Sequence, residues 1–198
     1  MSDPDQKPVR GRPRKKSSDA VLDTAMHAYW KNDPVDVSVN AICQMAEISK
    51  PSLYRTFGNE DGLTLAALDR YAQLVLSDIF AILQRGTGMH DTLEALIEFA
   101  SADPRMATGC LFYKMRAGKH RLGPETRKRV DEIDAAARLG YTDFLQTRRD
   151  SGDWPGKISV EAGATYLSEQ IAFAFTQRAA GMEPSDIRDL LKMSLSVL

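Results

Sequence analysis

The chain has 198 residues, of which 43% are hydrophobic and 27% are charged, and its formal net charge is −1. This composition predicts a soluble globular protein, and the length allows one medium domain or two small ones. No apolar run approaches the roughly 20 residues that cross a bilayer, so we expect no membrane partner. The polar, basic start does not fit a secretory signal. Cys43 and Cys110 lie far apart in the sequence, which favours a reducing, cytoplasmic location.

Residues 1–16 predict a flexible basic arm because they are rich in Pro, Gly, Lys and Arg and contain almost nothing apolar. Residues 1–18 hold six Lys or Arg and two Asp, a net charge of +4, so the rest of the chain carries −5. A basic end on a nearly neutral chain fits a protein that contacts nucleic acid at one end only.

Three short helices are predicted next. Ser17 or Ser18 caps a first helix that extends to about Lys31. Ser38 caps a second, and a tight corner at residues 47–49 leads into a third, which Ser49 caps and in which Pro51 is tolerated in the first turn.

The third helix has apolar Leu53 and Phe57 on its inward side and polar residues on its outward side. The outward side chains are Lys50, Ser52, Tyr54, Arg55 and Thr56. These are residue types that reach phosphates and base edges, and the helix is roughly 12 Å long, close to the width of a B-DNA major groove. On pattern alone, an ordinary helical corner with a solvated polar face fits equally well.

This region resembles the amino-terminal domain of the TetR/AcrR family of transcriptional regulators, from about Ser17 to Leu63. The matching residues are Val21-Leu22, Ala25, Tyr29, Ser38, Ile42, Ala46, Ile48-Ser49-Lys50 and Leu53-Tyr54-Arg55-x-Phe57. The resemblance implies an all-α fold with an N-terminal helix-turn-helix domain (17–63) and a C-terminal helical-bundle domain for effector binding and dimerisation (64–198).

Two positions depart from the family pattern. Glu47 occupies the corner position that the family usually gives to Gly, so it must bear about 1 kcal/mol of left-handed backbone strain. Residues 58–61, Gly-Asn-Glu-Asp, replace a basic residue that the family often sets against a phosphate just after this helix.

The arm contains Arg10-Gly11-Arg12-Pro13, which resembles the AT-hook, an extended peptide that lays arginines along an A·T-rich minor groove. The alternative is a basic tail that only increases solubility. The complete set of predicted DNA-binding residues is Arg10, Arg12, Arg14, Lys15, Ser38, Ser49, Lys50, Pro51, Ser52, Tyr54, Arg55 and Thr56.

Residues 59–198 predict further helices, without a convincing strand or repeat. Asn59 caps a long helix to about Arg85, a rigid lever between the two domains. Its inward residues are Leu63, Ala67, Tyr71, Leu74, Ile79 and Ile82. Asp91 and Glu94 predict a capping-box start for a helix to Ala102. The remaining helices are expected at about 108–117, 124–150, 160–180 and 185–198.

Residues 108–115 are rich in soft and aromatic side chains and resemble a Gly-Cys-Leu segment in the ligand domain of the family. With their neighbours they predict an effector pocket, although such residues on helices also form plain core. The candidate lining residues are Phe99, Met106, Cys110, Tyr113, Tyr141, Phe144, Tyr166, Gln170 and Phe173. Cys110, one turn before Lys114, is either a reactive thiol or a buried inert one.

The sequence predicts no enzyme, no metal site and no cofactor. The histidines, His27, His90 and His120, lack metal-ligand spacing, and no nucleophile–base or paired-carboxylate pattern occurs. The last two helices carry apolar residues on more than one face, which predicts a homodimer through them, unless these residues only close the chain's own core.

The resulting interpretation is a homodimeric regulator, by family analogy a repressor, that binds a near-palindromic double-stranded operator and is released by an unknown small-molecule effector. The main alternative is an architectural A·T-rich DNA binder that uses the basic arm and has no effector. A third is a helical enzyme or interaction module that does not bind DNA.

Overall fold

The computed structural model describes residues 17–198, and the regular elements within this range are all helical, so the all-α prediction is confirmed. The arm predicted for residues 1–16 lies outside the described residues. None of the described helices combines the length and the apolar character that crossing a membrane requires.

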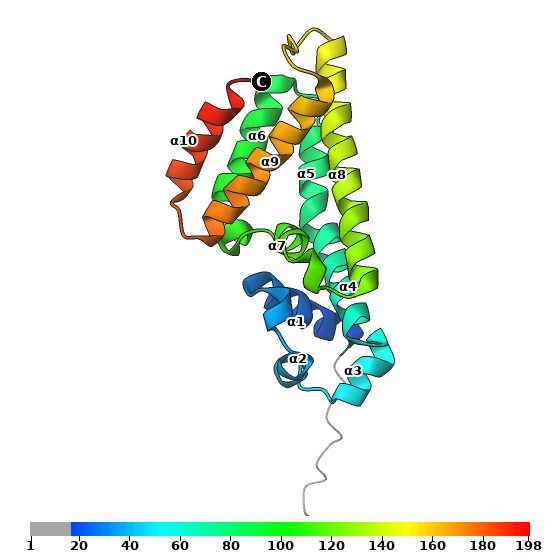
Figure 1. The fold of residues 1–198 in the computed structure, drawn as a ribbon. Coiled ribbons are helices and arrows are strands. Elements are labelled where there is room, and N and C mark those ends of the chain that lie inside the picture. The colour runs from blue at the N-terminus through cyan, green and yellow to red at the C-terminus, as the bar shows by residue number, and fades with distance from the viewer. Residues whose placement is uncertain (1–16) are drawn as a thin grey trace, which may run out of the picture.

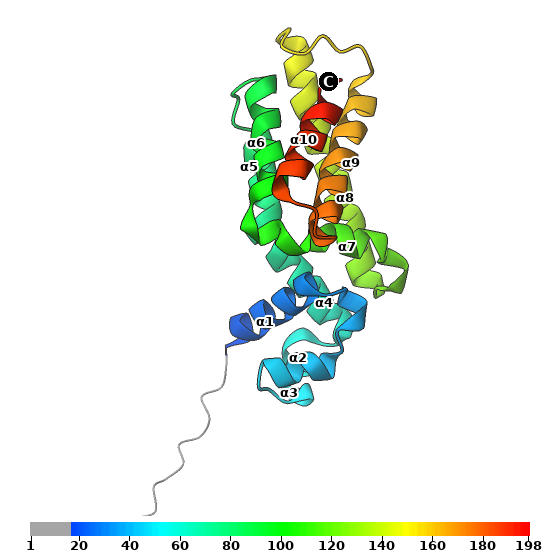
Figure 2. The ribbon, with the colours of Figure 1, turned by 90° about the vertical axis from the view of Figure 1, so that its left-hand side faces the viewer.

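The helices form two tiers (Figures 1 and 2). The lower tier contains α1 (Ser18–Lys31), α2 (Val39–Met45) and α3 (Lys50–Phe57), and α4 (Glu60–Tyr71) extends from it toward the upper tier. The upper tier is an upright bundle of α5 (Ser77–Leu83), α6 (Met89–Ala102), α8 (Pro124–Asp150), α9 (Val160–Ala179) and α10 (Pro184–Leu195). The short helix α7 (Leu111–Ala117) lies across the base of this bundle, above α1 (Figure 1).

The predicted helix starts in the lower tier are confirmed. The hydroxyls of Ser17, Ser38 and Ser49 each accept a hydrogen bond from the backbone N–H three residues later. Asn59 caps α4 in the same way, accepting from the N–H of Gly62 at 2.8 Å. Each such cap contributes about 1 kcal/mol, which matters most for helices as short as α2 and α3.

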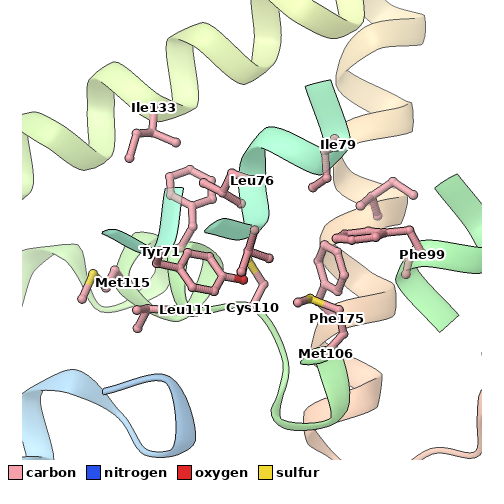
Figure 3. Close-up of a cluster of buried hydrophobic side chains, with 14 of the residues drawn as sticks. Tyr71, Leu76, Ile79, Phe99, Met106, Cys110, Leu111, Met115, Ile133 and Phe175 are labelled. Carbon is pink, nitrogen blue, oxygen red and sulfur yellow. The ribbon is translucent and has the colours of Figure 1, made fainter. Parts of the chain in front are cut away.

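One continuous cluster of buried apolar residues extends from α1 to α10, so the two tiers share their core. Figure 3 shows its centre, where Tyr71 of α4 meets the α7 segment and Phe99 meets Phe175 of α9. Fully burying one side chain of this size stabilises a fold by about 1.5–3 kcal/mol. The packing around Tyr71 therefore holds the lower tier firmly against the bundle.

The long helix predicted for residues 59–85 contains an irregular turn. Residues Ala72–Leu76 form a π-helical turn between α4 and α5. Within this wider turn the residues are displaced around the helix axis relative to a regular α-helix, so Val75 and Leu76 are buried while Leu74 is 48% exposed. The prediction that Leu74 points inward is therefore wrong. The carbonyl of Leu74 accepts a hydrogen bond from Arg105 at 3.3 Å.

The start of α6 also differs from the prediction. The helix begins at Met89, before the predicted capping box of Asp91 and Glu94, and Gly88 is its N-cap residue. The backbone N–H of Met89 donates instead to a carboxylate oxygen of Asp153, 2.6 Å away. Asp153 is 64 residues distant in sequence, so a local motif could not reveal this cap.

The short helix expected from about Thr108 begins three residues later, at Leu111. Pro104–Thr108 form a 3-10 turn, and Gly109 follows with φ +80°, which ends that turn. Two further 3-10 turns occupy Pro34–Asp36 and Lys119–Arg121. The bounds of α8, α9 and α10 agree with the predicted ones to within a residue or two, apart from the C-terminal end of α10.

Candidate nucleic-acid interface

The corner between α2 and α3 has the strained backbone that the sequence predicts. Glu47 has φ +52° and is the one non-glycine residue with positive φ among residues 17–198. The next residue, Ile48, is partly buried against the core, and its N–H donates to the carbonyl of Cys43 at 3.0 Å. The corner therefore fixes the angle between the two helices by a backbone hydrogen bond and an apolar contact.

The inner side of α3 holds the helix against the lower tier. Leu53 is fully buried, and Phe57 is partly buried against the same cluster. The outward prediction is confirmed for Lys50, Arg55 and Thr56, which are exposed. Ser52 and Tyr54 are half-buried. The ring of Tyr54 packs against the core cluster.

Contacts within α3 arrange its polar side chains. The ammonium of Lys50 lies 5.4 Å from the centre of the Tyr54 ring, a cation–π contact. The guanidinium of Arg55 donates to the hydroxyl of Ser52 at 3.3 Å. The hydroxyl of Tyr54 lies 3.5 Å from a carboxylate oxygen of Glu60, at the limit of a hydrogen bond. Lys50 and Arg55 are therefore ordered by uncharged partners.

No carboxylate among residues 17–198 lies within 4.0 Å of the charged groups of Lys50 or Arg55. Most other arginines of the described chain have such a partner, including Arg70 with Asp23 at 2.9 Å and Arg129 with Asp69 at 2.6 Å. An exposed cation without a carboxylate partner can bind a phosphate without first breaking an ion pair.

A hollow of about 360 Å³ separates the start of α1 from α3; we call it the α1–α3 hollow. It is lined by Ser17, Ser18, Val21, Ile48, Ser52, Thr56 and Phe57. Ser17, the first residue that the structure describes, is therefore close to α3. The sequence predicts Ser18 only as a cap, yet it also lines this hollow. The backbone N–H groups at a helix start are the signal that indicates an anion contact.

The other predicted DNA-binding residues divide into two groups. Ser38 and Ser49 are exposed cap residues, and Pro51 is exposed in the first turn of α3. Arg10, Arg12, Arg14 and Lys15 lie outside the described residues.

The tiers meet at a contact that we call the joint, formed by Trp30 and Asp61 below and by Gly109, Lys114 and Thr126 above. The indole N–H of Trp30 donates to the carbonyl of Gly109 at 2.7 Å, and the ammonium of Lys114 donates to the carbonyl of Trp30 at 2.6 Å. The end of α1 is thus bound to the α7 segment through both its side chain and its backbone.

Asp61, in the first turn of α4, also caps α8. Its carboxylate accepts hydrogen bonds from the N–H of Glu125 at 2.9 Å and from the N–H and hydroxyl of Thr126 at 3.1 and 2.5 Å. Burial would raise the pKa of this carboxyl, but the hydrogen bonds from Thr126 and Glu125 outweigh it and hold the pKa below its ordinary value. Asp61, four residues after the end of α3, therefore anchors α8, the longest of the described helices.

The candidate effector residues do not form one pocket. Tyr113 and Tyr141 line a cavity of about 20 Å³ among α5, α7 and α8, room for about one water. The hydroxyl of Tyr141 has no hydrogen-bond partner among the described residues. Cys110 and Tyr113 line a separate groove of about 180 Å³ between α7 and α9.

The remaining effector candidates lie in neither space. Phe99, Met106 and Phe144 are buried in the core (Figure 3 shows the first two), and the hydroxyl of Tyr166 donates to the carbonyl of Ser194 at 2.8 Å. Gln170 is half-buried. Phe173 is 42% exposed on the outer face of α9, because it is about half a turn away from the buried Ile171 and Phe175.

Cys110 has the surroundings of an unreactive thiol. It is buried, and the hydroxyl of Tyr71 donates to its sulfur at 3.2 Å (Figure 3). Burial raises the pKa of this thiol, which favours the protonated form.

A comparison with solved structures identifies the fold. The TetR family transcriptional regulator CifR, as a cysteine mutant complexed with 26-bp double-strand operator DNA, matches with a TM-score of 0.77 and 19% identity over 94% of this chain and 98% of that chain. This chain has the TetR-family fold. Within that fold, α2 and α3 are the helix-turn-helix and the upper tier is the C-terminal helical domain.

Two curated relatives of this TetR-fold chain come from Escherichia coli strain K12. The HTH-type transcriptional repressor ComR is 38% identical over 65 residues, but this match spans only 33% of the chain and 31% of ComR. The HTH-type transcriptional repressor BdcR is 24% identical over 143 residues, 72% of the chain and 73% of BdcR. No family model matches the chain.

Proposed function

We propose that the chain is a transcriptional repressor that binds double-stranded DNA through α3. The observation that carries this proposal is the outer face of α3, a helix braced from behind by Leu53, where two exposed cations have no carboxylate of residues 17–198 within 4.0 Å. The similarity to CifR, whose structure contains operator DNA, and to the repressors ComR and BdcR supports it.

The DNA-reading residues in this proposal are those from Lys50 to Thr56. Arg55 and Lys50 can reach guanine edges or phosphates, and the half-buried ring of Tyr54 leaves its hydroxyl at the rim. Ser38, Ser49 and the start of α1 would contact the backbone, and residues 10–16 would follow the neighbouring minor groove. In the same proposal residues 17–63 form the DNA-binding domain, and residues 64–198 form the effector and dimerisation domain.

The partner of the chain in this proposal is a second copy. Helices α9 and α10 lie side by side on one flank (Figure 2) and expose Phe173 and Met193 at 42% and 67%, and Val197, just after the end of α10, is 65% exposed. Apolar side chains so exposed favour a two-fold contact that buries them. Such a dimer presents two α3 helices to successive major grooves of a near-palindromic operator, with half-sites about 34–36 Å or more apart.

Release from the operator belongs to the same proposal. An effector that binds the upper tier more tightly in one relative placement of the two α3 helices shifts the dimer toward that placement. Because its partner is chromosomal DNA, the protein acts in the cytoplasm. We assign it no catalytic step.

The experiment is a selection of duplexes from a random-sequence library by the full chain at moderate salt. We expect enrichment of a near-palindrome and a salt-dependent affinity. A variant that lacks residues 1–16 should select the same sequence with lower affinity. If that variant loses all binding and the full chain selects only A·T-rich DNA without a palindrome, the architectural alternative is correct. If the full chain enriches no DNA, the proposal is wrong.

A further inference from the structure

The groove between α7 and α9 touches the joint directly. On the α7 side it is lined by Gly109, Tyr113 and Lys114, and on the α9 side by Phe175 and Ala179. Gly109 and Lys114 are also the two residues that hydrogen-bond to Trp30. A molecule in the groove would therefore contact both attachments of the end of α1.

The shape of the groove limits the size of its ligand. Its volume of about 180 Å³ is below the roughly 300–1,000 Å³ of sites for drug-sized molecules. Its lining is largely apolar and includes Phe175, Ala179 and the ring of Tyr113. The groove thus suits a small molecule whose body is a single ring or a short aliphatic chain.

The charge of the groove indicates that its ligand carries a negative group. Lys114 supplies the one cationic side chain in this lining, and no carboxylate among the described residues lies within 4.0 Å of its ammonium. That ammonium has three N–H donors, of which one is used by the carbonyl of Trp30. Burial lowers the pKa of Lys114, the direction expected for a cation that lacks a close anionic partner.

We propose that this groove binds a small organic anion with an apolar body, and that the carboxylate of the ligand takes the ammonium of Lys114 away from the carbonyl of Trp30. A carboxylate is a stronger partner for an ammonium than a neutral carbonyl, so the exchange is favourable. The exchange frees the backbone of α1 at its C-terminal end, while the indole of Trp30 still contacts Gly109. The effect on DNA rests on the proposed function; the binding site does not.

Gly109 makes the connection between groove and joint stiff. Its φ is +80°, and a Cβ there would lie 2.9 Å from the carbonyl oxygen of Phe175 and 3.0 Å from the Cβ of Ala179. The backbone that accepts the indole hydrogen bond of Trp30 is therefore pressed against α9. A ligand that moves α7 relative to α9 must also move the end of α1.

Trp30 itself provides the measurement. The chain has two tryptophans, so Trp154→Phe leaves Trp30 as the only one, and Trp154 lies in the loop between α8 and α9. We expect sodium benzoate and sodium hexanoate each to change the Trp30 emission saturably. Benzyl alcohol, which has the ring of benzoate without its charge, should bind about tenfold more weakly. The same titration of the unsubstituted chain, with a constant background from Trp154, serves if the variant does not fold.

A matched pair of variants tests the role of the cation. Lys114→Met keeps the apolar stem and should weaken benzoate binding about tenfold, to the level of benzyl alcohol. Lys128→Met, which removes an exposed lysine from α8, should leave it unchanged. The proposal is overturned if neither anion gives a saturable change at millimolar concentration, or if Lys114→Met binds benzoate as the unsubstituted chain does.

The DNA readout separates the two proposals. Saturating benzoate should lower the affinity of the unsubstituted chain for its selected duplex and leave that of Lys114→Met unchanged. A chain that binds its duplex but shows no Trp30 response overturns the groove and not the repressor. A chain that binds benzoate beside Trp30 but never retains DNA overturns the repressor and not the groove.

Discussion

On α3, Lys50 and Arg55 face solvent with no carboxylate of the described chain within 4.0 Å, whereas at the joint Asp61 is enclosed by three hydrogen bonds from Glu125 and Thr126. Both regions are polar and both lie next to α4. The carboxylate of the joint is satisfied by hydrogen bonds inside the chain, whereas the two cations of α3 contact only uncharged groups among the described residues. The joint therefore fixes the orientation of the two tiers, and the outer face of α3 is the surface that we propose binds DNA.

Removing the two cations of α3 should have the largest effect on DNA affinity. The double variant Lys50→Ala, Arg55→Ala should lose roughly 100-fold or more in affinity for the selected duplex, because each lost contact costs about 1–3 kcal/mol. It should also lower the salt dependence by about 0.9 per phosphate contact removed. Fluorescence anisotropy at several salt concentrations measures both quantities.

Its control is Lys128→Ala, Arg85→Ala, which removes two cations outside α3. That control should keep the affinity, and both double variants should unfold at the same urea concentration as the unsubstituted chain. Equal loss of affinity in the two double variants would contradict a specific role of α3.

At the joint, Gly123→Ala should produce the largest loss of stability. A Cβ at this position would lie 2.2 Å from Cγ of Asp61 and 2.5 Å from its carboxylate oxygen. The Asp61 carboxylate must then leave the start of α8, which removes the acceptor of the backbone N–H groups of Glu125 and Thr126 and costs about 1–3 kcal/mol. Urea unfolding followed by circular dichroism measures the change.

The matched control is Gly118→Ala, where the nearest atom to a new Cβ is 3.5 Å away and φ is −90°. We expect less than half the effect of Gly123→Ala. If both substitutions are tolerated equally, Asp61 does not hold α8 as described.

The sequence predicted the lower tier better than the upper one, for a physical reason. Caps such as Ser38 and Ser49 and the strain at Glu47 are local consequences of neighbouring residues, so the sequence contains them. The cap of α6 by Asp153, the π-turn that exposes Leu74 and the bond between Trp30 and Gly109 join residues far apart in the chain. Such pairings arise only when the elements pack, and no local pattern reveals them.

The candidate sites show the same limit. The outward side of α3 followed from helical periodicity, except that Ser52 and Tyr54 pack more deeply than expected. The effector prediction depends on side-chain type. Side-chain type does not distinguish a core residue such as Met106 from a groove residue such as Tyr113. The proposed role of Lys114 in anion binding depends on its hydrogen bond to the carbonyl of Trp30, which is 84 residues away in the sequence.

The corner of the helix-turn-helix offers a smaller effect of opposite sign. Glu47→Gly should raise the free energy of unfolding by about 1 kcal/mol, because Gly adopts φ +52° without strain. Glu47→Ala also removes the carboxylate but keeps the strain, so it isolates the backbone contribution. Urea unfolding of the two variants compares them, and an equal stability would show that the corner is unstrained.

The smallest expected effect is on the acid side of the pH profile. The pKa of Asp61 is lower in the folded chain than the ordinary 3.8, so its stabilising contribution is present above pH 3.8 and is lost as the pH falls through the folded value. Asp61→Asn should therefore show a shallower loss of stability below pH 3.8 than the unsubstituted chain. Unfolding free energies at a series of pH values from neutral to strongly acidic measure it; parallel profiles would contradict this role of Asp61.

In the proposed complex the outer face of α3 reads base edges. The most direct measurement repeats the duplex selection with Arg55→Ala and compares the enriched sequences with those of the unsubstituted chain. We predict that the preference is relaxed at one position in each half-site and kept elsewhere. An enriched sequence and an affinity identical to those of the unsubstituted chain would contradict base reading by α3.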